Sequence, residues 1–177
     1  MKIYVASSWR NDFQPHVIAA LRAIGHEVYD FKQPTPGDNG FHWTEVDGDW
    51  KQWTPSEFRD ALDHPIARMG YRKDMDALER CDVCVLVMPC GRSAHLEAGY
   101  AIGAGKPTAI LLANAEPELM YKMARICLTL TEVIDFVNNC CHYETEGGFN
   151  VATSPDCSHT AANSEGVSNA IQQSARR

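Results

Sequence analysis

One carboxylate of the sequence stands among small and apolar residues. Glu97 lies in PCGRSAHLEAGYAIGAGKP (residues 89–107), and Arg92, Ser93 and His95 come just before it. The Ala and Gly residues around Glu97 would let a ligand approach closely, and a lone carboxylate in such a pocket suits a nucleophile or a general base. The alternative is an acid near a helix start, favoured by the helix dipole. With Ser93 as the N-cap, however, Glu97 would lie beyond the strongest capping positions.

Three loops carry further groups that could bind a ligand. They are SSWRN after the first expected strand, the Pro-, Gly- and Trp-rich stretch 33–55 after the second, and CGRSAHLE after a third. Ligands of an open parallel sheet bind beyond the carboxyl ends of its strands, so we expect the loops to meet there. The side chains that they would bring together are Ser7, Ser8, Trp9, Arg10, His42, Trp43, Arg92, Ser93, His95 and Glu97.

These loop residues allow two interpretations. Hydroxyl and guanidinium groups beside the backbone N–H groups of a helix start make a natural phosphate or carboxylate site, but they are also ordinary turn residues and exposed arginines. Trp43, Trp50 and Trp53 could stack on a base or hold down a long loop. No G-x-G-x-x-G or Walker A pattern occurs, so a dinucleotide or nucleoside triphosphate site has little support.

The block KDMDALERCDV contains three further acids. Asp82 directly precedes an apolar strand and is expected to bond neighbouring backbone, whereas Asp74 and Asp76 lie on a helix, where a solvated face is the simplest interpretation. Tyr4, on the first expected strand, reads on its own as a core residue.

Short apolar runs alternate with helix-like stretches along the chain. The expected strands are 2–7, 26–31, 82–89, 107–113 and 126–130. The expected helices are 11–25, 56–80 with a break near Pro65, one within 89–107, a short one at 116–124, and 131–140 with Thr131 as its cap. This alternation predicts a single α/β domain, with a doubly wound, mostly parallel five-stranded sheet of flavodoxin- or Rossmann-like form and helices on both faces.

Composition narrows the function further. The 177 residues carry a net charge of −7 and no Lys/Arg cluster, which disfavours tight binding to a nucleic acid polymer. We find no secretion signal and no apolar run of about 18 residues, so we expect a cytoplasmic protein that does not associate with membranes. The odd count of seven cysteines favours reduced thiols. Cys81 and Cys84 form a C-x-x-C without a second ligand pair, so structural cysteines are favoured over a metal or redox site, and we expect no metal or cofactor.

Four blocks of the sequence resemble the nucleoside 2-deoxyribosyltransferase-like proteins, a family that includes deoxyribosyltransferases and nucleoside 5′-monophosphate N-glycosidases. The blocks are IYVASSWRN, DMDALERCDV, HLEAGYAIGAGKP and ELMYKMA, and the likeness covers roughly residues 2–141. It implies that residues 1–144 form one domain of this family with an insertion at about 33–55. Residues 145–177 are polar and are expected to form a weakly ordered tail.

The resemblance also implies a reaction. Glu97 would attack the anomeric carbon of a nucleoside or nucleotide, Asp74 would protonate or bind the leaving base, and Tyr4 would orient the Glu97 carboxylate. The resulting glycosyl-enzyme would pass its sugar to water or to a second base. The family further implies a homodimer or higher homo-oligomer, in which Glu118 and Met120 belong to the segment that a neighbouring subunit lends to the active site.

One position departs from the family pattern. Where transferases carry a further acid and the monophosphate hydrolases a phosphate-binding serine, this chain has Gly91. Ser8 and Arg10 match the hydrolases' phosphate loop, Trp9 resembles the transferases, and Arg92 with Ser93 could anchor a phosphate nearby. We therefore favour a nucleotide N-glycosidase over a transferase. The alternatives are a non-catalytic nucleotide-binding or sensor module and an NAD-type glycohydrolase.

Overall fold

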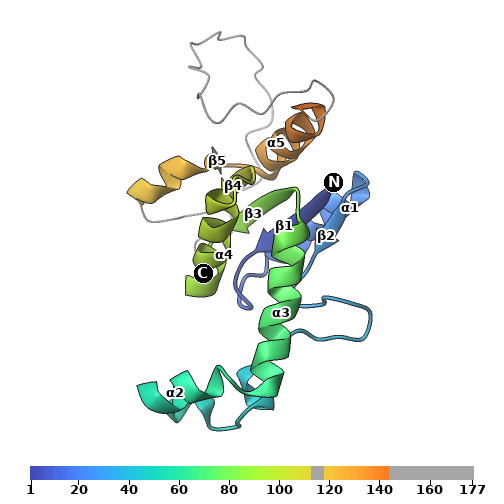
Figure 1. Ribbon diagram of the computed structural model, residues 1–177. Coiled ribbons are helices and arrows are strands. Elements are labelled where there is room, and N and C mark those ends of the chain that lie inside the picture. The colour runs from blue at the N-terminus through green and yellow to red at the C-terminus, as the bar shows by residue number, and fades with distance from the viewer. Residues whose placement is uncertain (113–117, 144–177) are drawn as a thin grey trace, which may run out of the picture.

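The computed structural model describes residues 1–112 and 118–143, with side chains up to residue 140. Its centre is a parallel sheet with the strand order β2-β1-β3-β4-β5 (Figure 1). The strands are β1 (Lys2–Ala6), β2 (Glu27–Tyr29), β3 (Val83–Val87), β4 (Thr108–Leu111) and β5 (Arg125–Cys127). The α-helices are α1 (Gln14–Ala23), α2 (Pro55–Ala61), α3 (Pro65–Arg80), α4 (Arg92–Gly103) and α5 (Leu130–Tyr143), and the 3-10 helices are η1 (Trp43–Glu45), η2 (Trp50–Gln52) and η3 (Leu119–Met123).

Helices cover both faces of the sheet because successive strand residues point to opposite sides. Ile3 and Val5 of β1 belong to the core beneath α1 and α5. Tyr4 and Ala6 belong to the second core, beneath α3 and α4, which lie side by side on the same face in Figure 1. This arrangement confirms the doubly wound α/β fold that the sequence predicts. Within the described stretches no helix is long and apolar enough to cross a bilayer.

Two helix caps differ from the sequence-based expectation. The N-cap of α4 is Gly91 rather than Ser93, which is the second residue of the helix. At the start of α5, the hydroxyl of Thr129, and not that of Thr131, accepts the backbone N–H of Glu132 at 3.2 Å. Each helix thus begins earlier than expected, since glycine and threonine are both accepted N-cap residues. The tail expected at 145–177 lies outside the described residues.

The Trp-rich insertion forms an aromatic cluster of its own. The ring of Trp43 lies 4.8 Å from that of Phe41, 5.5 Å from that of Trp53 and 5.7 Å from that of Phe58, centroid to centroid. The indole N–H of Trp53 also donates to Asp47 at 2.7 Å. Trp43 and Trp53 therefore hold the insertion together, one of the two roles that the sequence left open.

Candidate active site

Two stacked tyrosines on neighbouring strands lie at the candidate site. Tyr4 of β1 and Tyr29 of β2 are paired in register, and their rings stack with centroids 5.3 Å apart and planes 18° apart. Tyr4 is fully buried, and its hydroxyl has no hydrogen-bond partner within the described part of the chain. Burial, followed by the charges of Glu97 and Asp74, raises the Tyr4 pKa far above its usual value, so the phenol stays protonated.

Asp74 reaches the site from α3. Its carboxylate Oδ1 accepts a hydrogen bond from the Tyr29 hydroxyl at 2.8 Å. Burial raises the pKa of Asp74, while the Tyr29 hydrogen bond and the charge of Lys73 act in the opposite direction. Asp74 is therefore a half-buried acid held by a tyrosine rather than a residue of a solvated helix face. Asp76, two positions on, is exposed, as the sequence suggests.

Glu97 reaches the same site from the second turn of α4. Burial, and then the charge of Asp74, raises its pKa to about 7, while interaction with the Tyr4 hydroxyl lowers it. Within the described residues the Tyr4 hydroxyl itself makes no hydrogen bond of standard geometry. At neutral pH the Glu97 carboxyl thus sits near the midpoint of its titration, which is unusual for a glutamate.

The small residues around Glu97 have a packing role. Ala94, Ala98 and Ala101 are buried in the core between α4 and the sheet, so they let the helix approach the strands closely. The sequence suggested that these alanines would line open space beside the carboxylate, but they lie in the core instead. Gly99 is exposed, and a Cβ there would meet no atom within 4 Å.

The loop after β1 is fastened to the loop after β3. The Ser7 hydroxyl donates to the Val87 carbonyl at 2.9 Å, so this serine joins the loop after β1 to the end of β3. Asn11 is 4% exposed, and its amide nitrogen donates to the carbonyls of Val87 at 3.2 Å and Pro89 at 3.1 Å. Its Oδ1 accepts the backbone N–H groups of Phe13 and Gln14. This role of Asn11 was not predicted from the sequence, although an Asn just before a helix is a known start signal.

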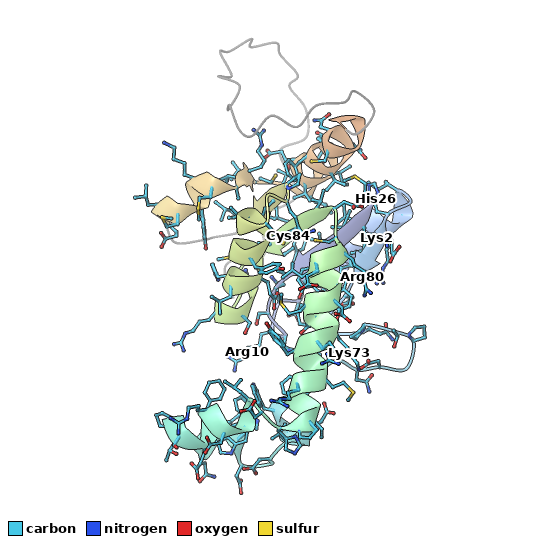
Figure 2. The ribbon with its side chains drawn as sticks, in the orientation of Figure 1. Lys2, Arg10, His26, Lys73, Arg80 and Cys84 are labelled. Atoms are coloured by element: carbon cyan, nitrogen blue, oxygen red, sulfur yellow. The ribbon has the colours of Figure 1, made fainter. Side chains whose placement is uncertain are left out.

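The residues expected to bind phosphate lie at the protein surface, on the loop after β1 and in the first turn of α4. Ser8 accepts the backbone N–H of Arg10 at 3.2 Å, and the Arg10 side chain is exposed. Figure 2 shows Arg10 on the α4 side of α3, with Lys73 on the opposite side of that helix. Arg92 and Ser93 are exposed in the first turn of α4. These side chains could therefore meet an anion, together with the backbone N–H groups of the helix start.

Gly91 leaves open space at the start of α4. Its backbone is extended, with φ −92° and ψ −175°, and no side chain caps the helix. A Cβ at this position would meet no atom within 4 Å. The polar side chain that the family resemblance implies here would therefore fit.

The insertion contributes His42 rather than Trp43 to the first loop. The ring of His42 lies 4.3 Å from that of Trp9 at a tilt of 40°, and the ring of Phe31 meets Trp9 edge-on at 5.4 Å. Gly40 fits beneath this group with φ +72°, where a Cβ would collide with the Phe31 carbonyl. Trp43, as described above, lies in the aromatic cluster of the insertion.

The segment that contains Glu118 and Met120 contacts α4 through Tyr121. The rings of His95 and Tyr121 stack at 5.9 Å, and His95 Nε2 lies 2.7 Å from the Tyr121 hydroxyl. Glu118 and Met120 are exposed, and Glu118 caps η3 by accepting the Met120 N–H at 3.1 Å. The link between His95 and Tyr121 was not predicted, since it joins residues 26 positions apart.

Other features of the chain have structural explanations. Asp82 accepts the backbone N–H of Lys2 at 2.6 Å, which confirms its expected role. Cys81 and Cys84 are buried free thiols, and the described residues contain no cluster of His, Cys, Asp or Glu suited to a metal. A hollow of about 660 Å³ between β2 and α3 is lined by Tyr29 but by neither Asp74 nor Glu97. A cavity of about 60 Å³ reaches Tyr29 and Asp74. The candidate site is defined by the two carboxylates, Asp74 and Glu97, because the volume of a hollow does not by itself indicate a reaction.

No family model and no curated protein matches the sequence. Solved structures similar to the chain include the following two. One is a 2-deoxyribosyltransferase of Bacillus psychrosaccharolyticus, 20% identical, with a TM-score of 0.47 and coverage of 75% of this chain and 90% of that one. The other is a CMP N-glycosidase of Clostridium botulinum, 17% identical, with a TM-score of 0.43 and coverage of 78% and 99%.

Proposed function

We propose that this chain is an enzyme that cleaves the N-glycosidic bond of a nucleoside or nucleoside 5′-monophosphate through a covalent intermediate on Glu97. The observation that carries the proposal is the carboxylate pair. Burial and the charge of Asp74 raise the Glu97 pKa to about 7, and Asp74 is itself a weakened acid. Two coupled carboxyls of this kind can share one proton at neutral pH, which leaves one ionised and one protonated.

The two carboxyls have different roles in the reaction. Ionised Glu97 attacks the anomeric carbon and forms a C–O bond, while the C–N bond breaks and its electron pair stays with the base. This step requires the form of the pair in which the shared proton has moved from Glu97 to Asp74. Asp74 then gives that proton to the departing base, so the leaving group is neutral. Water then attacks the anomeric carbon, the Glu97 carboxylate leaves, and the proton of that water returns to Asp74. This is the double displacement of retaining glycosidases.

We favour water as the acceptor over a second base. Gly91 stands where the resemblance implies an acid in transferases, and that acid would help to bind and deprotonate an incoming base. The position has room for a side chain but none is present. The same absence supports a second candidate, a nucleotide-binding module that does not turn over.

A 5′-phosphate would be bound at the protein surface by Ser8, Arg10, Arg92 and Ser93. Arginine suits this role because its planar guanidinium group can bind two phosphate oxygens at once. The positive end of the α4 dipole adds to the attraction. A few local cations of this kind can bind an anion although the whole chain is acidic.

We also propose that the chain assembles as a homodimer or a higher homo-oligomer. Large apolar side chains are exposed on three elements near the site: Tyr71 on α3 at 69%, Leu96 on α4 at 76%, and Leu119 and Met120 on η3 at 81% and 56%. Contact surfaces between protein chains commonly contain large exposed apolar side chains. Light scattering tests this, and a monomer at the concentrations used for assay would contradict it.

The experiment for the function is a substrate panel. Nucleosides and their 5′-monophosphates are incubated with the protein, with and without a free acceptor base, and the products are separated by chromatography. We expect base release without acceptor, and at least a 10³-fold loss in Glu97→Gln. Glu79→Gln, which changes an exposed glutamate on α3, is the matched control. Binding without turnover by the wild type would favour the non-catalytic module, and full activity of Glu97→Gln would exclude Glu97 as the nucleophile.

A further inference from the structure

Tyr29 is the second tyrosine of the site, and no role was predicted for it from the sequence. It ends β2 next to Tyr4, and its hydroxyl donates to Asp74 Oδ1 at 2.8 Å. In the described part of the chain, this is the one hydrogen bond made to the Asp74 side chain. Asp74 Oδ2 is therefore the oxygen left for a ligand.

The geometry of Tyr29 is fixed from two sides. Its ring stacks on the fully buried Tyr4, and its hydroxyl is held by Asp74 from α3. A phenol held in this way limits rotation of the carboxyl that it contacts.

We propose that Tyr29 is a positioning residue for the general acid: it holds Asp74 Oδ1, so that Asp74 Oδ2 carries the proton to the leaving base. This inference rests on the proposed function. The hydroxyl also stabilises the carboxylate that remains after proton transfer, because hydrogen bonds to a charged acceptor are the stronger ones.

Removal of the Tyr29 hydroxyl is expected to raise the pKa of Asp74. The hydrogen bond from Tyr29 lowers the pKa of Asp74, against the effect of burial. Without it, Asp74 holds its proton to higher pH and is a weaker acid. The other titratable or charged groups around the Asp74 carboxyl are Tyr4 on β1, Asp38 on the loop after β2, Lys73 on α3 and Glu97 on α4. Lys73 is engaged by Asp38 at 2.6 Å, so it does not replace the lost donor.

The test uses Tyr29→Phe, which keeps the ring and its stacking on Tyr4 but removes the hydroxyl. We expect kcat to fall roughly tenfold with KM nearly unchanged, and the alkaline limb of the pH profile to move to higher pH. Tyr100→Phe, which changes an exposed tyrosine on α4, is the matched control and should leave both unchanged.

A double-mutant cycle separates positioning from a merely structural role. If Tyr29 acts through Asp74, Tyr29→Phe costs little further activity in the Asp74→Asn background. An unmoved alkaline limb, or an equal loss of activity in the two backgrounds, would overturn the inference while the proposed function stands. Absence of turnover by the wild type would overturn both.

Discussion

The carboxyl of Glu97 on α4 lies close enough to that of Asp74 on α3 for the charge of Asp74, together with burial, to raise the Glu97 pKa to about 7. The two acids are 23 positions apart in the sequence. They meet because α3 and α4, which precede and follow β3 in the chain, cover the same face of the sheet. The account of function depends on this pair.

The first prediction concerns stability. The Glu97 pKa is raised from 4.5 to about 7 by folding, so between these pH values the folded chain keeps a proton that the unfolded chain releases. The free energy of unfolding therefore falls as pH rises through this window. We expect Glu97→Gln to be more stable than the wild type by about 1–3 kcal/mol at pH 8, and by much less near pH 4.5. Denaturant unfolding at both pH values measures this, and a difference that does not depend on pH would contradict it.

The second prediction concerns Asn11, which joins the loops after β1 and β3. Replacement by Ala removes the Asn11 hydrogen bonds to the Pro89 carbonyl and to the N–H groups of Phe13 and Gln14, while the Val87 carbonyl keeps its bond from Ser7. We expect a loss of about 2–4 kcal/mol in the free energy of unfolding. Asn39→Ala, on an exposed loop, is the control and should cost less than about 0.5 kcal/mol. Equal stability of the two variants would show that the Asn11 bonds are not needed.

The fold was largely predictable because its signals are local. Short apolar runs marked all five strands, and Pro65 marked the break before α3. Helix caps were less certain, because several candidates of suitable type lie within one turn. Gly91 and Ser93 compete at α4, and only the backbone conformation decides between them.

The site was partly predictable for a different reason. Tyr4, Asp74 and Glu97 carry recognisable sequence patterns, and the structure brings them together. Tyr29 was missed because its partner is 45 positions away on α3, and nothing in its neighbours indicates that contact. The link between His95 and Tyr121 was missed for the same reason.

The third prediction concerns the acceptor. Gly91→Asp supplies the acid that the resemblance implies in transferases, at a position with extended backbone and open space. We expect a larger share of new nucleoside relative to free sugar when an acceptor base is present. The ratio of the two products, measured by chromatography, reports this directly. Gly91→Ala controls for the added Cβ, and an unchanged ratio in the Asp variant would argue against a role for this position.

The fourth prediction concerns the phosphate. Arg10→Ala should raise KM for a 5′-monophosphate about tenfold and leave KM for the matching nucleoside almost unchanged, because only the former presents an anion. Arg59→Ala removes an exposed arginine from α2 and should change neither. Equal increases in KM for both substrates would remove Arg10 from the phosphate site.

The covalent intermediate is the central claim, and mass spectrometry of acid-quenched enzyme tests it most directly. During turnover, we expect a fraction of the intact protein to gain the mass of one sugar unit, and fragmentation to place that gain on Glu97. Glu97→Gln should gain none. A wild-type protein that turns over without any adduct, or with the adduct on another side chain, would contradict the account.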